Sequence, residues 1–247
     1  MNNALKVEYC FRLASRANDV SKQEVEDFIV RCLRFYREAE RPERSASSTN
    51  TETQPSDEFG ILAAMCMIRF SDVWASDDPG RARDISLIRA ASILERLLLD
   101  SPHNYLALLT LVRVYLLLGA GSLALKAFSK LSVKQFQYET VAHYLFTRLA
   151  TIHPHSAPPI EGAEFKDFDP QSALMQALKF YQNSDNTTVR HRTNGLEYGS
   201  YVNVAETIDM GKALKKSVCR RLFALEARQI LRLVGADPIN RYEQIGK

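Results

Sequence analysis

The stretch that decides the fold is AASILERLLLDSPHNYLALLTLVRVYLLLGAGSLALKAFSKL, residues 90–131. Small and large apolar residues recur along it with a period of about 34 residues. The recurring pairs are Ala90 with Ala124, Leu94 with Phe128, and Leu97 with Leu131. Two helices that cross closely need a small residue at the crossing and large apolar residues nearby. The stretch therefore predicts the second helix of one helical hairpin followed by most of the next hairpin.

The residues between these two helices fit the remaining parts of a hairpin. Pro102 stands where the period requires a helix breaker, and Gly119 stands where it requires a turn. The large positions of the intervening helix are Leu108, Leu111 and Tyr115. The pattern resembles the tetratricopeptide repeat, which implies an all-α fold, a superhelical array of such hairpins. An unrelated helical hairpin is the alternative, because amphipathic helices share some of these positions.

The composition is that of an ordinary soluble globular protein. Of 247 residues, 46% are apolar and 25% are charged, so most of the chain is expected to fold around a core. The formal net charge of +3 does not by itself indicate nucleic-acid binding. The N-terminus has no signal-peptide core, and the longest apolar stretch, around 104–125, is interrupted by Arg113. We therefore expect a cytoplasmic protein with no membrane partner.

Changes of composition divide the chain into five expected segments. They are 1–40, an N-terminal helical hairpin; 41–56, a disordered linker; 57–150, tetratricopeptide-like repeats; 151–168, a proline-rich connection; and 169–247, C-terminal helices. The linker is rich in Ser, Thr, Glu, Gln and Pro and has almost nothing to bury. Two pairs of residues, Ser21 with Glu24 and Asp169 with Pro170, are typical of helix starts.

Apolar periodicity predicts the further helices. They are expected over 57–76, 81–100 and 133–150, with two more between 201 and 234. The first of the last two is expected to break near Gly211. Trp74 falls on the apolar side of the helix over 57–76, so we expect it to pack in the core rather than to bind a ligand.

The cysteines and histidines do not indicate a metal site. The cysteines form no CxxC motif and lie in apolar helical contexts, which predicts buried, reduced thiols at Cys10, Cys32, Cys66 and Cys219. His153 and His155 would need further ligands, and no cluster of cysteines or carboxylates supplies them.

No catalytic or cofactor site is expected. Gly119-Ala120-Gly121 lies between two helices, whereas a phosphate-binding loop needs its glycines between a strand and a helix. An acetyl-CoA loop needs Arg or Gln three positions before the first glycine, where this chain has Leu116. No serine lies in a nucleophile elbow, and no cysteine is singled out by a nearby histidine.

One cluster of basic residues rises above the background. It comprises Lys212, Lys215, Lys216, Arg220 and Arg221. Lys212, Lys216 and Arg220 follow the i, i+4, i+8 spacing, which would align them on one helical face outside the core. A solvated face is one interpretation. The other is a contact with ribosomal RNA or with an acidic protein surface, where Lys and Arg attract phosphate or carboxylate groups.

Four segments of the chain carry a resemblance to a known family. They are Leu97–Asn104 with Leu116–Ala120, Val133–Gln137, and Glu197–Tyr201 leading to Ser217 and the Arg220-Arg221 pair. In these segments the chain resembles the auxiliary, non-catalytic subunit of the N-terminal acetyltransferase B complex, NatB. The similarity covers roughly residues 57–235.

This resemblance implies a helical scaffold that binds a catalytic acetyltransferase subunit and helps to hold it at the ribosome. The pair would acetylate nascent chains that begin Met-Asp, Met-Glu, Met-Asn or Met-Gln. Members of that family are considerably longer, which implies a fragment or a shortened relative. The alternative is a stand-alone helical-repeat adaptor that grips peptides, although Arg113 is the only candidate for the usual carboxylate clamp.

Overall fold

The computed structural model describes residues 2–16, 19–39, 53–71, 79–134, 136–158 and 169–236. Within these ranges every regular element is helical, as expected for the all-α class. Trp74, most of the expected linker and most of the proline-rich connection lie outside them. The chain divides into two compact units, Met1–Leu131 and Ser132–Lys247. The boundary between the units lies after Leu131, whereas the sequence predicted that residues 132–150 belong with the repeats.

The first unit begins with two helical segments. Helix α1, Asn2–Glu8, continues as a π-helical turn over Tyr9–Leu13 and a 3₁₀ turn over Ala14–Arg16. Helix α2 spans Lys22–Glu38. The side chain of Ser21 accepts a hydrogen bond from the Glu24 amide, and the Glu24 carboxylate accepts one from the Ser21 amide, which confirms the predicted capping box.

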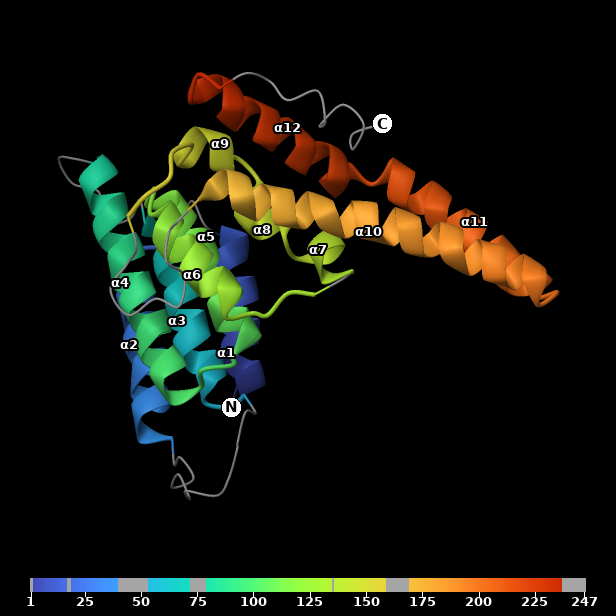
Figure 1. Ribbon diagram of the computed structural model, residues 1–247. Coiled ribbons are helices and arrows are strands. Elements are labelled where there is room, and N and C mark those ends of the chain that lie inside the picture. Colours follow the sequence, from blue (N-terminus) through green and yellow to red (C-terminus); the bar gives the residue numbers. More distant parts are fainter. Residues whose placement is uncertain are drawn as a thin grey trace, which may run out of the picture. The chain divides into compact units, whose positions relative to one another are not determined.

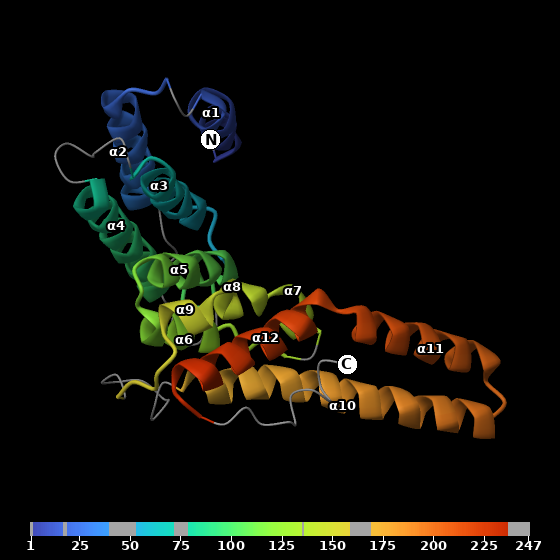
Figure 2. The same cartoon turned by 90° about the horizontal axis from the view of Figure 1, so that it is seen from above.

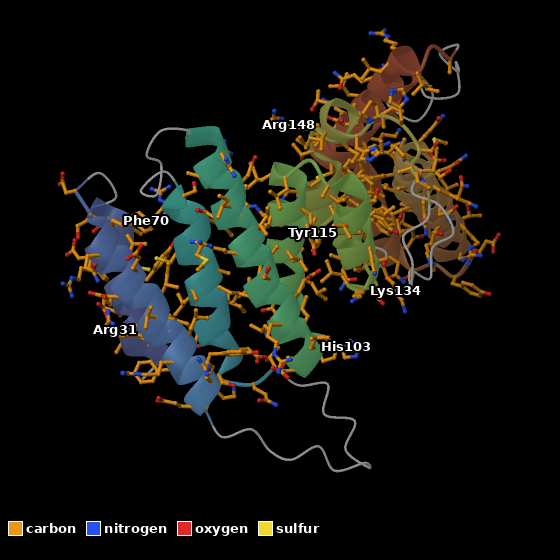
Figure 3. The ribbon with its side chains drawn as sticks, turned by 90° about the vertical axis from the view of Figure 1, so that its left-hand side faces the viewer. Arg31, Phe70, His103, Tyr115, Lys134 and Arg148 are labelled. Atoms are coloured by element: carbon orange, nitrogen blue, oxygen red, sulfur yellow. The ribbon has the colours of Figure 1, made fainter. Side chains whose placement is uncertain are left out.

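Four more helices lie in the described part of the first unit. They are α3, Asp57–Arg69; α4, Pro79–Asp100; α5, Tyr105–Leu117; and α6, Gly121–Ser129. Helices α2 to α5 lie side by side in chain order (Figures 1 and 3). Helix α3 ends at Arg69, before the expected end at residue 76. Gly60 makes close packing possible here, because a Cβ at this position would lie 2.9 Å from Leu97 Cδ1.

Most of the positions that recur in the sequence lie in this unit's core, whereas Leu131 is only half-buried. Those with at most 7% of their surface exposed are Ala90, Leu94, Leu97, Leu108, Leu111, Tyr115, Ala124 and Phe128. Ala90 and Ala124 have no exposed surface, which agrees with close helix crossing at both sites. Pro102 lies in the exposed turn before α5, and Gly119 has a φ of 71°, the left-handed conformation that glycine adopts at low cost.

Enlarging one of these small residues should destabilise the first unit. In Ala124→Phe the ring cannot fit without displacing α4 or α5, so we expect a loss of about 1 to 3 kcal/mol in the free energy of unfolding. Thermal and urea melts would measure it. Ala213→Phe, the same change at an exposed helical position, is the control. Equal melts for both variants would show that the register of the repeat is wrong.

Buried polar side chains fix the turn between α4 and α5. Asn104 caps α5 by accepting a hydrogen bond from the Ala107 amide at 3.1 Å. Its side-chain amide also donates to Asp57 Oδ2 at 3.0 Å, and both residues are buried. His103 is exposed at the same turn (Figure 3). The cap therefore ties the start of α5 to the start of α3.

The second unit begins with three single-turn helices rather than the helix expected over 133–150. They are α7, Gln137–Thr140; α8, His143–Phe146; and α9, Leu149–Ile152. The helix is first interrupted at Val141, after α7, and again at Arg148, whose φ of 68° is left-handed. The prediction was wrong because the stabilising contacts of this segment come from a distant helix, as described below.

Three long helices follow in the described part of the second unit. Helix α10 spans Pro170–Glu197, α11 spans Tyr201–Lys216 and α12 spans Val218–Leu233. Asp169 caps α10 and Pro170 occupies its first turn, as predicted. Helix α11 passes through Gly211 without the expected break. The interruption comes instead at Ser217, whose side chain accepts a hydrogen bond from the Arg220 amide and starts α12.

Helices α10 and α11 form an antiparallel hairpin, and α12 lies along the first half of α10 (Figure 2). The core of this unit is concentrated there. Its largest fully buried side chains are Leu145, Phe146, Leu149, Leu174, Tyr181 and Phe223. Between Tyr181 and Leu214 the only buried residue is Gly195, where a Cβ would lie 3.0 Å from Val204 Cγ2. The far end of the hairpin therefore has little core of its own.

Candidate protein-binding surfaces

The structure separates the five basic residues that the sequence grouped together. Lys212, Lys215 and Lys216 lie on α11, whereas Arg220 and Arg221 lie on α12, beyond the interruption at Ser217. Arg220 is buried, with 7% of its surface exposed. Its Nη1 lies 2.9 Å from Asp185 Oδ2, and its guanidinium lies over the Tyr181 ring at 5.9 Å. The prediction that Arg220 shares an exposed face with Lys212 and Lys216 was therefore wrong.

The remaining basic residues form a smaller surface. Lys212 Nζ lies 3.1 Å from Asp209 Oδ1, one turn earlier, so its charge is partly compensated. Lys215, Lys216 and Arg221 are exposed. We call Lys212, Lys215, Lys216 and Arg221 the basic surface.

A buried polar network holds α7, α10 and α12 together. Glu139 is its hub: the Tyr181 hydroxyl donates to its carboxylate, and Ser217 Oγ donates at 2.7 Å. The Cys219 thiol donates to the Glu139 carbonyl at 3.2 Å. Burial, together with the hydrogen bond to Glu139, raises the pKa of the Tyr181 hydroxyl well above its ordinary value of about 10. Tyr181 therefore stays protonated in the fold where the unfolded chain would ionise, and its contribution to stability is lost as pH rises above about 10.

A buried carboxylate on α12 explains the short helix α9. Glu226 on α12, with 5% of its surface exposed, accepts hydrogen bonds from the amides of Arg148 at 3.0 Å and Ala150 at 2.8 Å. These amides belong to the first turn of α9, where helix N–H groups lack partners in the helix itself. Glu226 thus acts as a cap contributed by another helix. Neither Glu226 nor Glu139 was singled out from the sequence.

The first unit has a groove between α4, α5 and α6, with a volume of about 480 Å³. We call it the leucine groove. Its lining residues are Ser92, Glu95, Arg96, Leu98, Leu99, Leu108, Leu111, Tyr115, Leu123, Lys126, Ala127 and Lys130. The groove thus combines an apolar floor with a charged rim.

The second unit has a groove of about 730 Å³ between α7, α10 and α11, which we call the aromatic groove. At its end the Phe180 ring lies 5.9 Å from Phe136, edge to face, and 5.8 Å from Tyr138, stacked. Gln176 and Asn183 also line it, and the side-chain amide of neither makes a hydrogen bond within the described part of the chain. The groove therefore offers both apolar rings and amide groups to a ligand.

The cysteines differ in exposure more than the sequence suggested. Cys32 and Cys66 are buried as expected, but Cys10 is exposed and Cys219 is half-buried. Cys10 falls on the outer side of the π-helical turn, which the apolar pattern did not predict. No group of three or more metal-ligating side chains occurs in the part of the chain that the structure describes. None of its helices is both long and apolar enough to cross a bilayer.

Thiol reactivity should follow this exposure. Burial raises the pKa of the thiols of Cys32 and Cys66 to about 12, so at about pH 8 few thiolates form there. With Ellman's reagent we expect Cys10 to react within the mixing time, and Cys32 and Cys66 to react only after unfolding by guanidinium. The Cys10→Ser variant should lose the fast phase. Four equally fast thiols would contradict the buried positions of Cys32 and Cys66.

Comparison with known proteins gives one consistent family. The whole chain, residues 1–247, matches the family described as N-acetyltransferase B complex (NatB) non catalytic subunit. It is 28% identical over 172 residues to the mouse protein "N-alpha-acetyltransferase 25, NatB auxiliary subunit", which is 70% of this chain and 16% of that protein. It is 28% identical over 154 residues to "N-terminal acetyltransferase B complex subunit arm1" of Schizosaccharomyces pombe, which is 62% of this chain and 18% of that protein. The matched segment therefore covers less than a fifth of the length of each of these relatives.

Proposed function

Because the chain belongs to the family of non-catalytic subunits of the N-acetyltransferase B complex, we propose that it is a helical scaffold that binds the catalytic subunit of that acetyltransferase. The observation that carries this proposal is the family match over residues 1–247. The helical hairpins of the first unit and the two grooves support it, because stacked hairpins present extended surfaces to protein partners. The complex would act in the cytoplasm on chains that begin Met-Asp, Met-Glu, Met-Asn or Met-Gln.

Co-expression with the catalytic subunit tests this function. We expect the tagged chain to retain the catalytic subunit through affinity purification and gel filtration. The chain alone should neither bind acetyl-CoA nor acetylate a Met-Asp peptide, and the co-purified complex should do both. Acetylation by the chain alone would contradict a scaffold, and so would failure to retain the catalytic subunit when both proteins are folded.

We further propose that the basic surface contacts ribosomal RNA. Phosphate contacts by Lys and Arg release counterions, so their strength falls steeply with salt concentration. Replacing Lys212, Lys215 and Lys216 by glutamate should reduce sedimentation with ribosomes at low salt and leave stability within about 0.5 kcal/mol per site, because all three are exposed. The control is the same change of charge on α2, at Lys22, Arg34 and Arg37. If the parent and both variants sedimented equally with ribosomes, the basic surface would not contact ribosomal RNA and would be only a solvated face.

A stand-alone adaptor for extended peptides is the second candidate function. The aromatic groove favours it, because the free amides of Gln176 and Asn183 match the donor and acceptor of a peptide backbone. The rings of Phe136, Tyr138 and Phe180 could hold an apolar side chain. Peptides selected from a random library should then bind the parent and not Asn183→Ala or Phe180→Ala. Selection of no peptide, together with retention of the catalytic subunit, would exclude the adaptor.

A further inference from the structure

The leucine groove exposes apolar surface that the described part of the first unit leaves uncovered. Its floor consists of buried side chains of α5, among them Leu108 and Leu111. On the α4 wall, however, Leu99 is 64% exposed. Leu123 on α6 is half-buried. Leu99 and Leu123 lie on the two walls, so an apolar occupant of the groove would bury both.

The α4 wall has the pattern of a helix that packs against another helix. Ile85, Ile88, Ser92, Glu95 and Leu99 follow alternating spacings of three and four residues, which place them on one stripe of the helix. Ile85 is 41% exposed and Ile88 is 55% exposed. Such a stripe matches an occupant helix with apolar residues at the same spacing, as in other helix-in-groove complexes.

The rim of the groove is positively charged. Arg96, Lys126 and Lys130 contribute three positive charges against the one negative charge of Glu95. Glu95 already accepts a hydrogen bond from the Tyr115 hydroxyl. Arg96 Nη2 lies 3.8 Å from Asp100 Oδ1, which is a long and weak ion pair. Charge complementarity therefore favours an acidic occupant over a neutral or basic one.

We propose that the leucine groove binds an acidic amphipathic helix. Its apolar side chains would cover Leu99 and Leu123, and its carboxylates would lie beside Lys126 and Lys130. This inference goes beyond the scaffold function, because it states the chemistry of the helix that binds in the groove. It does not depend on which protein contains that helix. It also concerns the first unit alone and is separate from the basic surface of the second unit.

A designed peptide tests the proposal directly. The probe is a fluorescent helix of about 18 residues with leucine on one stripe and glutamate on both flanks, measured by anisotropy against the full chain. We expect binding that weakens by about tenfold or more in Lys126→Glu/Lys130→Glu and in Leu99→Ser, and that weakens with added salt. Leu99 is exposed, so its replacement should leave the fold intact, which circular dichroism and thermal melts would verify.

Two controls distinguish binding of the probe in the groove from non-specific electrostatic attraction between the probe and the chain. Arg190→Glu/Arg192→Glu in the second unit makes the same change of charge outside the groove and should bind the probe like the parent. A probe with lysine in place of every glutamate should not bind. Equal binding of both probes, or unchanged binding in the Lys126→Glu/Lys130→Glu variant, would overturn the proposal. So would dimerisation of the chain through this groove without competition by the acidic probe, since a second copy would then be its occupant.

Discussion

Replacing Arg220 by methionine is expected to destabilise the second unit by about 2 to 4 kcal/mol. The guanidinium is buried against Asp185 and over the Tyr181 ring, and its amide begins α12 through Ser217. Methionine keeps much of the packing volume but leaves the Asp185 carboxylate without this partner in a partly buried site. Urea titration followed by circular dichroism would measure the loss of stability.

The neighbouring residue provides a matched control. Arg221 is exposed, so Arg221→Met should change the free energy of unfolding by no more than about 0.5 kcal/mol. The double variant Arg220→Met/Asp185→Leu should recover part of the loss, because an apolar pair removes the unpaired charge. If Arg220→Met and Arg221→Met were equally mild, the guanidinium of Arg220 would not be buried against Asp185.

Glu226→Ala is the second substitution with a large expected effect. It would remove the acceptor of the Arg148 and Ala150 amides, and the Ala150 amide is buried. Each buried N–H left without a partner costs about 1 to 3 kcal/mol, so we expect a loss of about 3 kcal/mol. Hydrogen exchange of the Ala150 amide should accelerate in the variant, because α9 loses its cap.

The conservative change distinguishes the cap from packing. Glu226→Gln keeps the side chain's size and one oxygen acceptor, so it should cost about half as much as Glu226→Ala. If both variants were as stable as the parent, the hydrogen bonds from α12 would contribute nothing measurable to α9. If both were equally unstable, the negative charge rather than the number of hydrogen bonds would be what α9 requires.

The fold of the first unit could be predicted from the sequence because its rules are local. A helical period can be recognised within one stretch of chain, at Ala90, Leu94, Ala124 and Phe128. The burial of these four residues follows from that period. Capping pairs act over three residues, so Ser21 with Glu24 could be recognised in the same way.

The segments that carried the family resemblance turn out to be turns and caps. Asn104 caps α5, Gln137 accepts a hydrogen bond from the Lys134 amide at 2.8 Å, and Gly199 adopts a φ of 70° between α10 and α11. Turn residues are constrained by backbone geometry as well as by burial. The residue types in these segments are therefore explained by the geometry of turns and caps. The segments do not by themselves mark a binding site.

The second unit was predicted less well, because its stabilising contacts join residues far apart in sequence. The basic cluster looked like one solvated face, and nothing local to Arg220 shows that Asp185 lies beside it. The prediction of one helix over 133–150 was wrong for the same reason. The apolar pattern of that segment does not show that Glu226 binds the Arg148 amide. The two grooves also depend on tertiary packing: their lining residues come from three elements each.

The cap on α9 has a consequence for synthesis of the protein on the ribosome. Glu226 follows Arg148 by 78 residues in the chain. At about 5 to 20 residues per second, roughly 4 to 16 s pass between synthesis of the two. During that interval the amides at the start of α9 have no carboxylate to bind, and the apolar side chains of Leu145, Phe146 and Leu149 have no α12 to cover them. The segment from α7 to α9 therefore completes its folding only after α12 has left the exit tunnel.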